Sequence, residues 1–473
     1  MAGQLTPWRE HELKLDPPPG FDLQAFLARA LEERRFTSIY YDTAAATLTR
    51  AGITLRRRVE GRTTKWQLKL PAEDARTEIE AAGGARQPPA ALDALLVAHL
   101  RVGGPLGEVA RLRTRRRFAR IDLADGARAE VAHDAVDVLD GRRIVDRFGE
   151  VEVELLAGED GALEGIAKRL ELAGAEPAAA VSKVARILPA PAAVDGAVTG
   201  AARVRSVLLA QRDALLAHDP GTRFGERPED LHQMRVAFRR TGACLRGGAQ
   251  FLPAAWHDEV RTLVREVLGQ LGPARDLDVF LAWLRAEAAQ LEARDAAALA
   301  VSLRTLEARV VPTRDQVRTA LDSDAYFAVL DLLSDPPVVE ADQTLADIAA
   351  GEVERLRRIA RKARRGDDEL LHRMRLRGKR ARYALELAAP ELGKRGKPAV
   401  AAAKELQDVL GEHQDAVVAE ERLRELAAGT HSARTALALG RLVERQHDRR
   451  RRARKSLTGA WRRFDQAAAR ALD

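Results

Sequence analysis

The sequence contains very few of the residues that form disulfides, aromatic stacking platforms or membrane spans. Its single cysteine, Cys244, excludes an intrachain disulfide framework and is typical of a reducing compartment. Aromatic residues make up 4% of the chain, which disfavours nucleic-acid binding by base stacking. Residues 1–9 lack the apolar core of a signal peptide, and no apolar run reaches the roughly 18 residues that span a membrane. We therefore expect a cytoplasmic protein with no membrane partner.

Charged residues, by contrast, are numerous and of both signs. The 78 Lys and Arg residues and the 70 Asp and Glu residues leave a net charge of +8, which favours an anionic partner. The acidic count argues against a uniformly basic surface, so the places where charges cluster are more informative than the total. At 473 residues, the chain is long enough for two or three domains with their own cores.

The most informative cluster is an alternating segment near the N-terminus. Glu10, Glu12 and Lys14 share one face of a predicted strand, because side chains alternate across a strand. Residues 150–154 repeat the pattern as Glu-Val-Glu-Val-Glu. If the two strands pack together, five carboxylates occupy one small volume, and a divalent cation would relieve their repulsion. The simpler interpretation is a solvated strand face.

After the first strand, residues 21–35 predict an amphipathic helix, and the chain then predicts many short strands. Strand-like segments are 38–43, 52–59, 65–70, 76–80, 111–122, 128–134, 137–140 and 148–156. Such a series without helical crossovers indicates an antiparallel barrel or sandwich. Basic residues alternate along three of the strands, so their charged faces meet either water or the lumen of a closed barrel. A lumen acidic on one wall and basic on the others would suit a polyanion bound with metal ions.

These residues resemble the CYTH superfamily, the triphosphate tunnel metalloenzymes. Glu10-x-Glu12-x-Lys14 is similar to its ExExK signature, and further similar segments follow in order to Ser182-Lys183-Val184-Ala185-Arg186. The resemblance covers residues 8–190 and implies an eight-stranded antiparallel β tunnel. Known members hydrolyse inorganic triphosphate or thiamine triphosphate, or act as adenylate cyclases.

The resemblance also implies which residues form the site. Catalysis would depend on Glu10, Glu12, Lys14, Glu152 and Glu154, and the four glutamates would bind Mg or Mn. Phosphate would be bound by Lys14, Arg56, Arg58, Lys69, Lys183 and either Arg115 or Arg117. The choice between the last two stays open, because the run 113–117 is rich in arginine. Whether Glu152 or Glu154 binds metal or orients water is also open.

The second half of the chain is predicted to be entirely helical. A domain over 1–190 is followed by a Pro- and Ala-rich linker over 191–200 and an all-α bundle over 201–473. The bundle contains an internal repeat, since His232-x-x-Arg235-x-x-x-Arg239-Arg240 recurs as His372-x-x-Arg375-x-x-x-Lys379-Arg380. About forty residues after each copy comes a predicted Leu-Gly turn with an aspartate four positions later, namely Asp276 and Asp415. The two copies predict two basic helix stripes related by a twofold repeat. Leu231, Phe238 and Leu245 occupy a neighbouring stripe and are expected to face the core.

This half resembles the CHAD domain, the conserved histidine α-helical domain. Its members bind inorganic polyphosphate through such helices and often follow a CYTH domain. The resemblance implies that the binding residues are His232, Arg235, Arg239, Arg240, His372, Arg375, Lys379 and Arg380. Metal binding by the two histidines is disfavoured, because a histidine beside arginines is more simply a phosphate donor.

The combined prediction is an enzyme, a Mg- or Mn-dependent inorganic triphosphatase fused to a polyphosphate-binding module. One alternative is a non-catalytic polyphosphate-binding or targeting protein, and another is a triphosphatase for an organic substrate such as thiamine triphosphate. Nucleic acid is a disfavoured partner. A cytoplasmic location, with association with polyphosphate granules as an option, completes the expectation.

Overall fold

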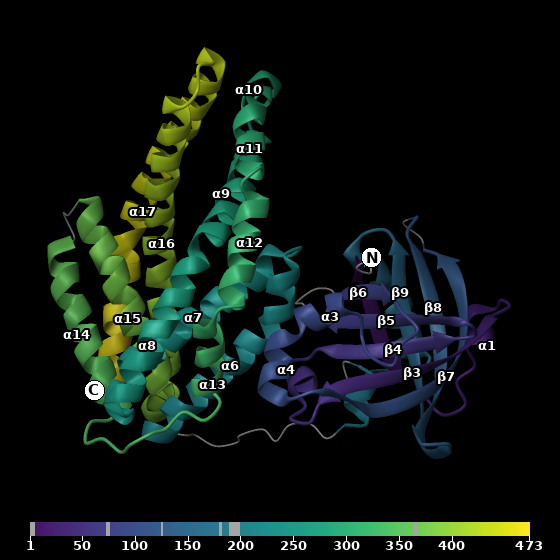
Figure 1. The fold of residues 1–473 in the computed structure, drawn as a ribbon. Coiled ribbons are helices and arrows are strands. Elements are labelled where there is room, and N and C mark those ends of the chain that lie inside the picture. Colours follow the sequence, from purple (N-terminus) through teal and green to yellow (C-terminus); the bar gives the residue numbers. More distant parts are fainter. Residues whose placement is uncertain (1–4, 72–75, 124–125, 179–181, 189–198, 364–366) are drawn as a thin grey trace. The chain divides into compact units, whose positions relative to one another are not determined.

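The computed structural model describes residues 5–71, 76–123, 126–178, 182–188, 199–363 and 367–473 (Figure 1). The chain divides into two compact units, one of residues 1–194 and 219–224 and one of residues 195–218 and 225–473. Most of the predicted linker, 191–198, lies outside the described residues. Each unit is described by itself.

The first unit is built on one antiparallel sheet of ten strands. The strands are β1 (Thr6–Glu10), β2 (Glu12–Asp16), β3 (Glu32–Thr43), β4 (Thr54–Glu60), β5 (Thr63–Leu70), β6 (Arg76–Ala82), β7 (Leu106–Asp122), β8 (Arg128–Asp140), β9 (Arg143–Ala157) and β10 (Glu176–Pro177). Their order is β1-β6-β5-β4-β3-β7-β8-β9-β2-β10. The sheet therefore has ten strands rather than the expected eight, because the first strand is interrupted at His11 and the two-residue β10 is added.

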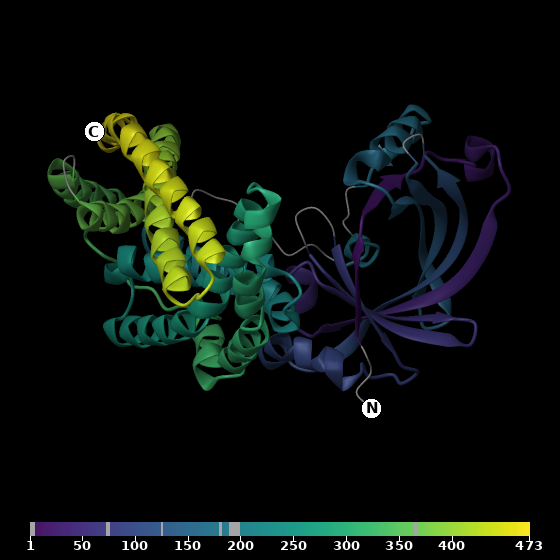
Figure 2. The same cartoon turned by 90° about the horizontal axis from the view of Figure 1, so that it is seen from above.

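The two ends of the sheet are connected by the chain itself. β1 pairs with β6 and β2 pairs with β9, so the two halves of the first strand belong to opposite ends of the strand order. Within the described residues the hydrogen-bonded ladder does not close on itself. Because only His11 separates β1 from β2, these two parts of the strand order lie close together, and the sheet is strongly curved (Figure 2).

The apolar face of this sheet points outward and is covered by short helices. They are α1 (Leu23–Leu27), α2 (Thr47–Arg50), α3 (Ala90–Leu95), α4 (Val97–Gly103) and α5 (Glu164–Leu172). One core packs Val131, Val151 and Val153 against Ile166 and Leu170 of α5. A second core joins the alternate residues of β4, β5 and β6 to α2 and α3. Because the outer face is apolar, the charged faces of the strands line the interior. Of the two interpretations of these charged faces, the structure therefore favours the one in which they line a lumen over the one in which they meet water.

The second unit is helical, as predicted. Its helices are α6 (Gly200–Phe224), α7 (Pro228–Gly247), α8 (Ala254–Gln270), α9 (Gly272–Ala288), α10 (Ala293–Ala298), α11 (Ala300–Glu307), α12 (Val310–Leu321), α13 (Asp324–Leu332), α14 (Leu345–Ala363), α15 (Asp368–Leu392), α16 (Gly396–Ala428) and α17 (Ala433–Leu472). The two longest, α16 and α17, lie side by side (Figure 1). None of the described helices is long and apolar enough to cross a membrane.

The predicted repeat corresponds to helices α7 and α15, with one local difference between the copies. In the first copy a new helix starts at Gly272, immediately after Leu271. In the second copy Leu410 and Gly411 lie inside the continuous helix α16, so the predicted turn is absent there. A Leu-Gly pair alone does not end a helix when the flanking residues are strong helix formers.

Candidate functional site

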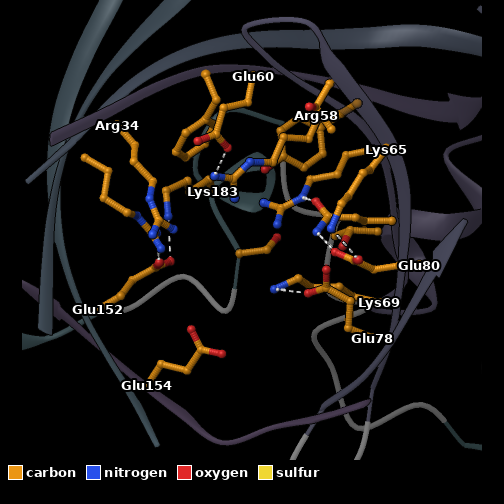
Figure 3. A pocket seen from close by; sticks show the side chains of 18 of the residues that line it. Arg34, Arg58, Glu60, Lys65, Lys69, Glu78, Glu80, Glu152, Glu154 and Lys183 are labelled. Carbon is orange, nitrogen blue, oxygen red and sulfur yellow. Dashed lines mark hydrogen bonds and ion pairs between the residues drawn. The ribbon is translucent and has the colours of Figure 1, made fainter. Parts of the chain in front are cut away.

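The first unit contains a cavity of about 600 Å³ whose walls are strongly charged. Eight cationic side chains line it: Lys14, Arg34, Arg56, Arg58, Lys65, Lys69, Arg116 and Lys183. Five carboxylates line it as well: Glu60, Glu78, Glu80, Glu152 and Glu154. Figure 3 shows the last two on one side of the cavity and the Lys65, Lys69, Glu78 and Glu80 group on the other.

The acidic side of the cavity is built by the pairing of β2, β9 and β8. Glu12 lies opposite Glu154, which in turn lies opposite Glu130 on the next strand. Two residues further along β2, Lys14 lies opposite Glu152. Cross-strand neighbours on one face are about 4.5–5.5 Å apart at Cβ, so the register forms a row of three carboxylates beside a lysine. The register thus places Glu12 of the first alternating segment beside Glu154 of the second, whereas Glu130 belongs to neither segment.

Below this row, Glu152 is surrounded by cations. Its Oε1 accepts hydrogen bonds from Lys14 Nζ at 2.7 Å and from Lys183 Nζ at 2.5 Å, and its Oε2 accepts one from Arg116. Burial alone would raise the pKa of Glu152, but the three cations hold it well below its usual range. Glu152 is therefore an anion that orients two lysines and an arginine.

Lys183 is the centre of a second, deeper group of carboxylates. Its Nζ lies 2.7 Å from Glu150 and 3.1 Å from Asp134, and both of those side chains are fully buried. Burial alone would lower the pKa of Lys183, but the surrounding carboxylates raise it well above its usual range. Glu150 was among the five carboxylates expected to converge, but it was not predicted as a site residue.

The structure corrects the arginine of the run 113–117. Arg116, rather than Arg115 or Arg117, faces the cavity, and it donates to Asp134 at 2.8 Å. Arg115 is exposed, and Arg117 reaches Gln24 on the outer surface. The reason is register: Arg116 lies opposite Asp134, so it shares the inward face with the acidic residues. Consecutive arginines occupy both faces of the strand, which concealed this parity in the sequence.

On the basic side, the cations are held in place by neighbouring polar groups. Arg56 Nε donates to Gln67 at 2.8 Å, and Lys69 pairs with the buried Glu78 at 3.0 Å. Arg58 pairs with Glu60 at 2.8 Å, and its guanidinium lies 3.7 Å from the Phe36 ring centroid. Three predicted phosphate-binding residues, Arg56, Arg58 and Lys69, are thus brought together and oriented.

Besides Arg116, the predicted site lacked five charged residues that line the cavity: Arg34, Glu60, Lys65, Glu78 and Glu80. Glu78 and Glu80 alternate in the segment Arg-Thr-Glu-Ile-Glu, the same signal that identified the other acidic strands, and both line the cavity. Arg34 lies opposite Arg116 on β3, where the sequence predicted a helix over residues 21–35. The signal for Arg34 was hidden by the surrounding charged residues.

The described carboxylates suit a divalent cation in their chemistry but do not converge into a site. Oxygen donors suit Mg or Mn, and Glu12, Glu154 and Glu130 lie in register on neighbouring strands. Within the described residues, however, no three such groups converge closely enough to hold an ion as they stand. The side chain of Glu10, whose backbone pairs with Arg76, is outside the described residues.

One end of the cavity is filled by an apolar plug, defined here as residues 182–188. Val184 packs in a cluster with Tyr40, Leu112, Val136 and Val138. Those four residues share the inward parity with Arg116 and Asp134, so this core lies inside the tunnel. The cavity is consequently blind at the plug, and the same segment places Lys183 at its inner end.

The helical unit contains a separate pocket of about 640 Å³. It is lined by His232, Arg235 and Arg239 of α7 and by His372 and Arg375 of α15, so the two predicted stripes converge. Arg235 donates to the backbone oxygen of Gly272 at 3.0 Å, and His372 Nδ1 lies 2.7 Å from Gln414. We name this the stripe pocket.

Three other predicted polyphosphate-binding residues do not line the stripe pocket. Arg240 lines a different, smaller pocket of about 200 Å³ together with Cys244 and Tyr383, and Arg380 is exposed. Both follow a stripe residue directly, and one helical step turns a side chain by roughly 100° away from its neighbour. Burial lowers the pKa of Lys379 to about 8, and repulsion from the charges of Arg375 and Arg239 contributes to this shift.

Comparison with known proteins defines the class. The family model of the CYTH domain matches residues 9–188, and that of the CHAD domain matches residues 206–424. The chain belongs to the proteins that join a CYTH domain to a CHAD domain. It is similar to two curated proteins of Mycobacterium tuberculosis, the uncharacterized proteins MT2285 (strain CDC 1551 / Oshkosh) and Rv2226 (strain ATCC 25618 / H37Rv). Each is 32% identical over 505 residues, which cover 96% of this chain and 95% of the relative.

Similar solved structures include proteins with either type of domain. PptA from Streptomyces chartreusis is 22% identical and covers 56% of this chain and 100% of its own, with a TM-score of 0.47. The CHAD domain of the plant Ricinus communis is 25% identical, with coverages of 57% and 96% and a TM-score of 0.43. An adenylyl cyclase-like protein from Hippeastrum, described as having a dominant triphosphatase activity, is 21% identical, with coverages of 37% and 93% and a TM-score of 0.26.

Proposed function

We propose that the chain is a divalent-metal-dependent triphosphatase that hydrolyses inorganic triphosphate in its CYTH domain and binds inorganic polyphosphate through its CHAD domain. The observation behind this proposal is the charged cavity, which is lined by eight cationic and five acidic side chains, with Glu12 and Glu130 in register with Glu154. Such a mixed lining suits a compact polyanion whose charge is partly neutralised by a metal ion. A site for a lone anion would have no use for the row of carboxylates.

In this proposal the row of Glu12, Glu154 and Glu130 holds Mg or Mn, with Glu10 as a further ligand. Such an ion would polarise phosphoryl oxygens and make a bound water more acidic. Arg56, Arg58 and Lys69 bind phosphate oxygens from the opposite wall, each already oriented by a polar neighbour. We assign Glu152 to orienting Lys14 and Lys183 towards the transferred phosphate, because both lysines are bonded to it.

The blind end of the cavity favours short substrates. A long chain has no route through a tunnel whose inner end is packed with Val184 and its apolar neighbours. A triphosphate fits entirely between the row of carboxylates and the plug, whereas a long polyphosphate could insert only its end. We therefore assign long polyphosphate to the CHAD domain, where two basic stripes lie side by side on the pocket wall.

The test is phosphate release from inorganic triphosphate, ATP, thiamine triphosphate and long polyphosphate, with Mg, with Mn and with chelator. We expect inorganic triphosphate to be the best substrate and Glu154→Gln to abolish metal-dependent turnover. Glu171→Gln, an exposed change in the same domain, is the matched control and should be silent. Metal-independent turnover, or full activity of Glu154→Gln, would contradict the proposal. Preference for thiamine triphosphate would instead assign the enzyme to an organic substrate.

The binding role of the CHAD domain has its own test. Charge reversal of Arg235 and Arg239 should weaken binding of long polyphosphate, and the further reversal of Arg375 and Lys379 should abolish it. Affinity should rise with chain length, since contact with the second stripe becomes intramolecular. It should fall with salt, because the contacts are ionic. Unchanged binding of long chains by the quadruple variant would remove the polyphosphate role and leave the triphosphatase proposal intact.

A further inference from the structure

Two carboxylates lie among the basic residues of the stripe pocket. Asp276 and Asp415 are the aspartates of the internal repeat, and both line the pocket. Asp276 accepts a hydrogen bond from Arg235 at 3.2 Å and so helps to orient this arginine. The side chains of Asp276 and Asp415 are both exposed, so each remains accessible to a ligand. Vicinal hydroxyl groups, as on a ribose, are ligands that acidic residues bind in nucleotide sites.

The wall beyond these aspartates is apolar and partly aromatic. One turn along α9 from Asp276 come Val279, which is 50% exposed, and Phe280, and a further turn brings Trp283. On the facing helix α16, Val418 follows Asp415 at the same spacing. Inorganic polyphosphate has no apolar surface that could cover such a wall.

The aromatic side chains on this wall are fixed in place. The rings of Phe280 and Trp283 are stacked, with centroids 5.6 Å apart and planes inclined by 27°. Trp283 also packs against the hydrophobic core of α9, α16 and α17. Arg422 covers Phe280 with its guanidinium carbon 5.2 Å from the ring centroid, and it donates to the backbone oxygen of Asp276 at 2.8 Å. A rigid indole beside an anion site is a ready stacking surface for a base.

We propose that the stripe pocket binds a nucleoside polyphosphate, with its phosphates on the stripes of α7 and α15, its ribose hydroxyls on Asp276 and Asp415, and its base on Trp283. This inference rests on the proposed anion binding by the same stripes, and it adds the organic part of the ligand. A volume of about 640 Å³ is within the range of about 300–1,000 Å³ typical of small-molecule sites.

The test uses the full chain and 8-azido-ATP, whose photolabel is located by peptide mass spectrometry. Mapping is necessary because the tunnel also accommodates a triphosphate. We expect labelled peptides from α9 or α16, with labelling reduced about tenfold in Trp283→Ala and retained in Trp283→Phe, which keeps a ring. Trp256→Ala removes a partly buried tryptophan outside the pocket and should leave the label unchanged.

Binding of long inorganic polyphosphate, measured on the same variants, separates this inference from the proposed function. We expect Trp283→Ala to retain that binding within about twofold, whereas Arg375→Ala weakens both ligands. If α9 and α16 stay unlabelled, or if Trp283→Ala is labelled as strongly as the wild type, the nucleotide assignment is wrong. Loss of polyphosphate binding in Arg375→Ala would then still support the proposed polyphosphate role, and its retention would overturn that role as well and leave the triphosphatase proposal intact.

Discussion

At the scale of single residues, Arg116 and Arg115 are one position apart but in opposite environments. Arg116 compensates the buried Asp134 and also pairs with Glu152, whereas Arg115 is exposed. Removing one partner of a buried ion pair costs about 3–5 kcal/mol, while an exposed change costs within about 0.5 kcal/mol. We expect Arg116→Ala to destabilise the sheet and to reduce triphosphate hydrolysis sharply, and Arg115→Ala to do neither.

Hydrogen exchange of the β7 and β8 amides measures the first effect, and initial rates of phosphate release measure the second. Arg116→Lys keeps the charge and should recover part of the stability. Equal losses in Arg115→Ala and Arg116→Ala would show that both arginines matter equally and would contradict the inward assignment of Arg116.

The pKa of Lys379 predicts how polyphosphate affinity and stability change with pH. Its pKa of about 8 means that it loses its proton as the pH rises from 7 to 9. Polyphosphate affinity should therefore fall over this range, and Lys379→Arg should flatten the profile because arginine stays protonated. The free energy of unfolding should change in the opposite direction and rise with pH. The unfolded chain, in which lysine has its usual pKa of 10.5, binds more protons between pH 8 and 10.5, so the domain gains stability as the pH rises through that window.

Binding assays and thermal melts at pH 7, 8 and 9 check both trends. Arg373→Lys, an exposed change on the same helix, serves as the control for general effects of pH. A flat affinity profile in the wild type would show that Lys379 does not contribute to the anion site.

At the scale of elements, the apolar plug of residues 182–188 holds Lys183, which we propose binds phosphate. Val184 is buried in the tunnel and stands directly after Lys183. Val184→Ala should cost roughly 1–3 kcal/mol through the cavity it leaves, and it should lower kcat for triphosphate by loosening Lys183. Ala185→Ser changes the exposed neighbour and should behave as the wild type. Wild-type kcat in a measurably destabilised Val184→Ala would show that the plug does not position Lys183.

The sequence predicted where strands and helices lie better than it predicted which face of each strand points to the interior. Strand alternation identified the acidic strands, and helical spacing identified the core stripe of Leu231, Phe238 and Leu245, all of which are buried. Charge parity alone could not say whether a charged face meets water or a lumen, because that depends on which face the helices α1 to α5 cover. The packing of these helices on the sheet, between residues distant in the sequence, determined that the charged faces point to the interior.

Other errors have local physical causes. In the run 113–117, arginine occupies both faces of the strand, so composition conceals which side chain points inward. Residues 32–35 were predicted as helix from their charged, helix-favouring composition, yet they pair with β7 as part of β3. Sheet pairing overrode local propensity there, as tertiary context commonly does.

At the scale of the whole molecule, the two proposed activities should separate when metal is removed. In the proposed function the tunnel depends on a cation held by carboxylates, whereas the arginines and histidines that line the stripe pocket would bind anions directly. With excess EDTA, triphosphate hydrolysis should cease while long polyphosphate still binds with affinity within about threefold. Phosphate release and filter binding on one preparation measure both. Loss of polyphosphate binding in EDTA would show that metal bridges the chain to the CHAD domain.

The pairing of β2 with the distant strand β9 has a consequence for biosynthesis. Lys14 and its partner Glu152 are separated by 138 residues, so β2 leaves the ribosome long before β9 exists. At about 5–20 residues per second, this delay lasts roughly 7–28 s. During that time the nascent chain exposes an unpaired edge rich in like charge, and its carboxylates discourage premature association with other strands. The ExExK segment that we assign to the metal site thus also protects the chain while it waits for its partner.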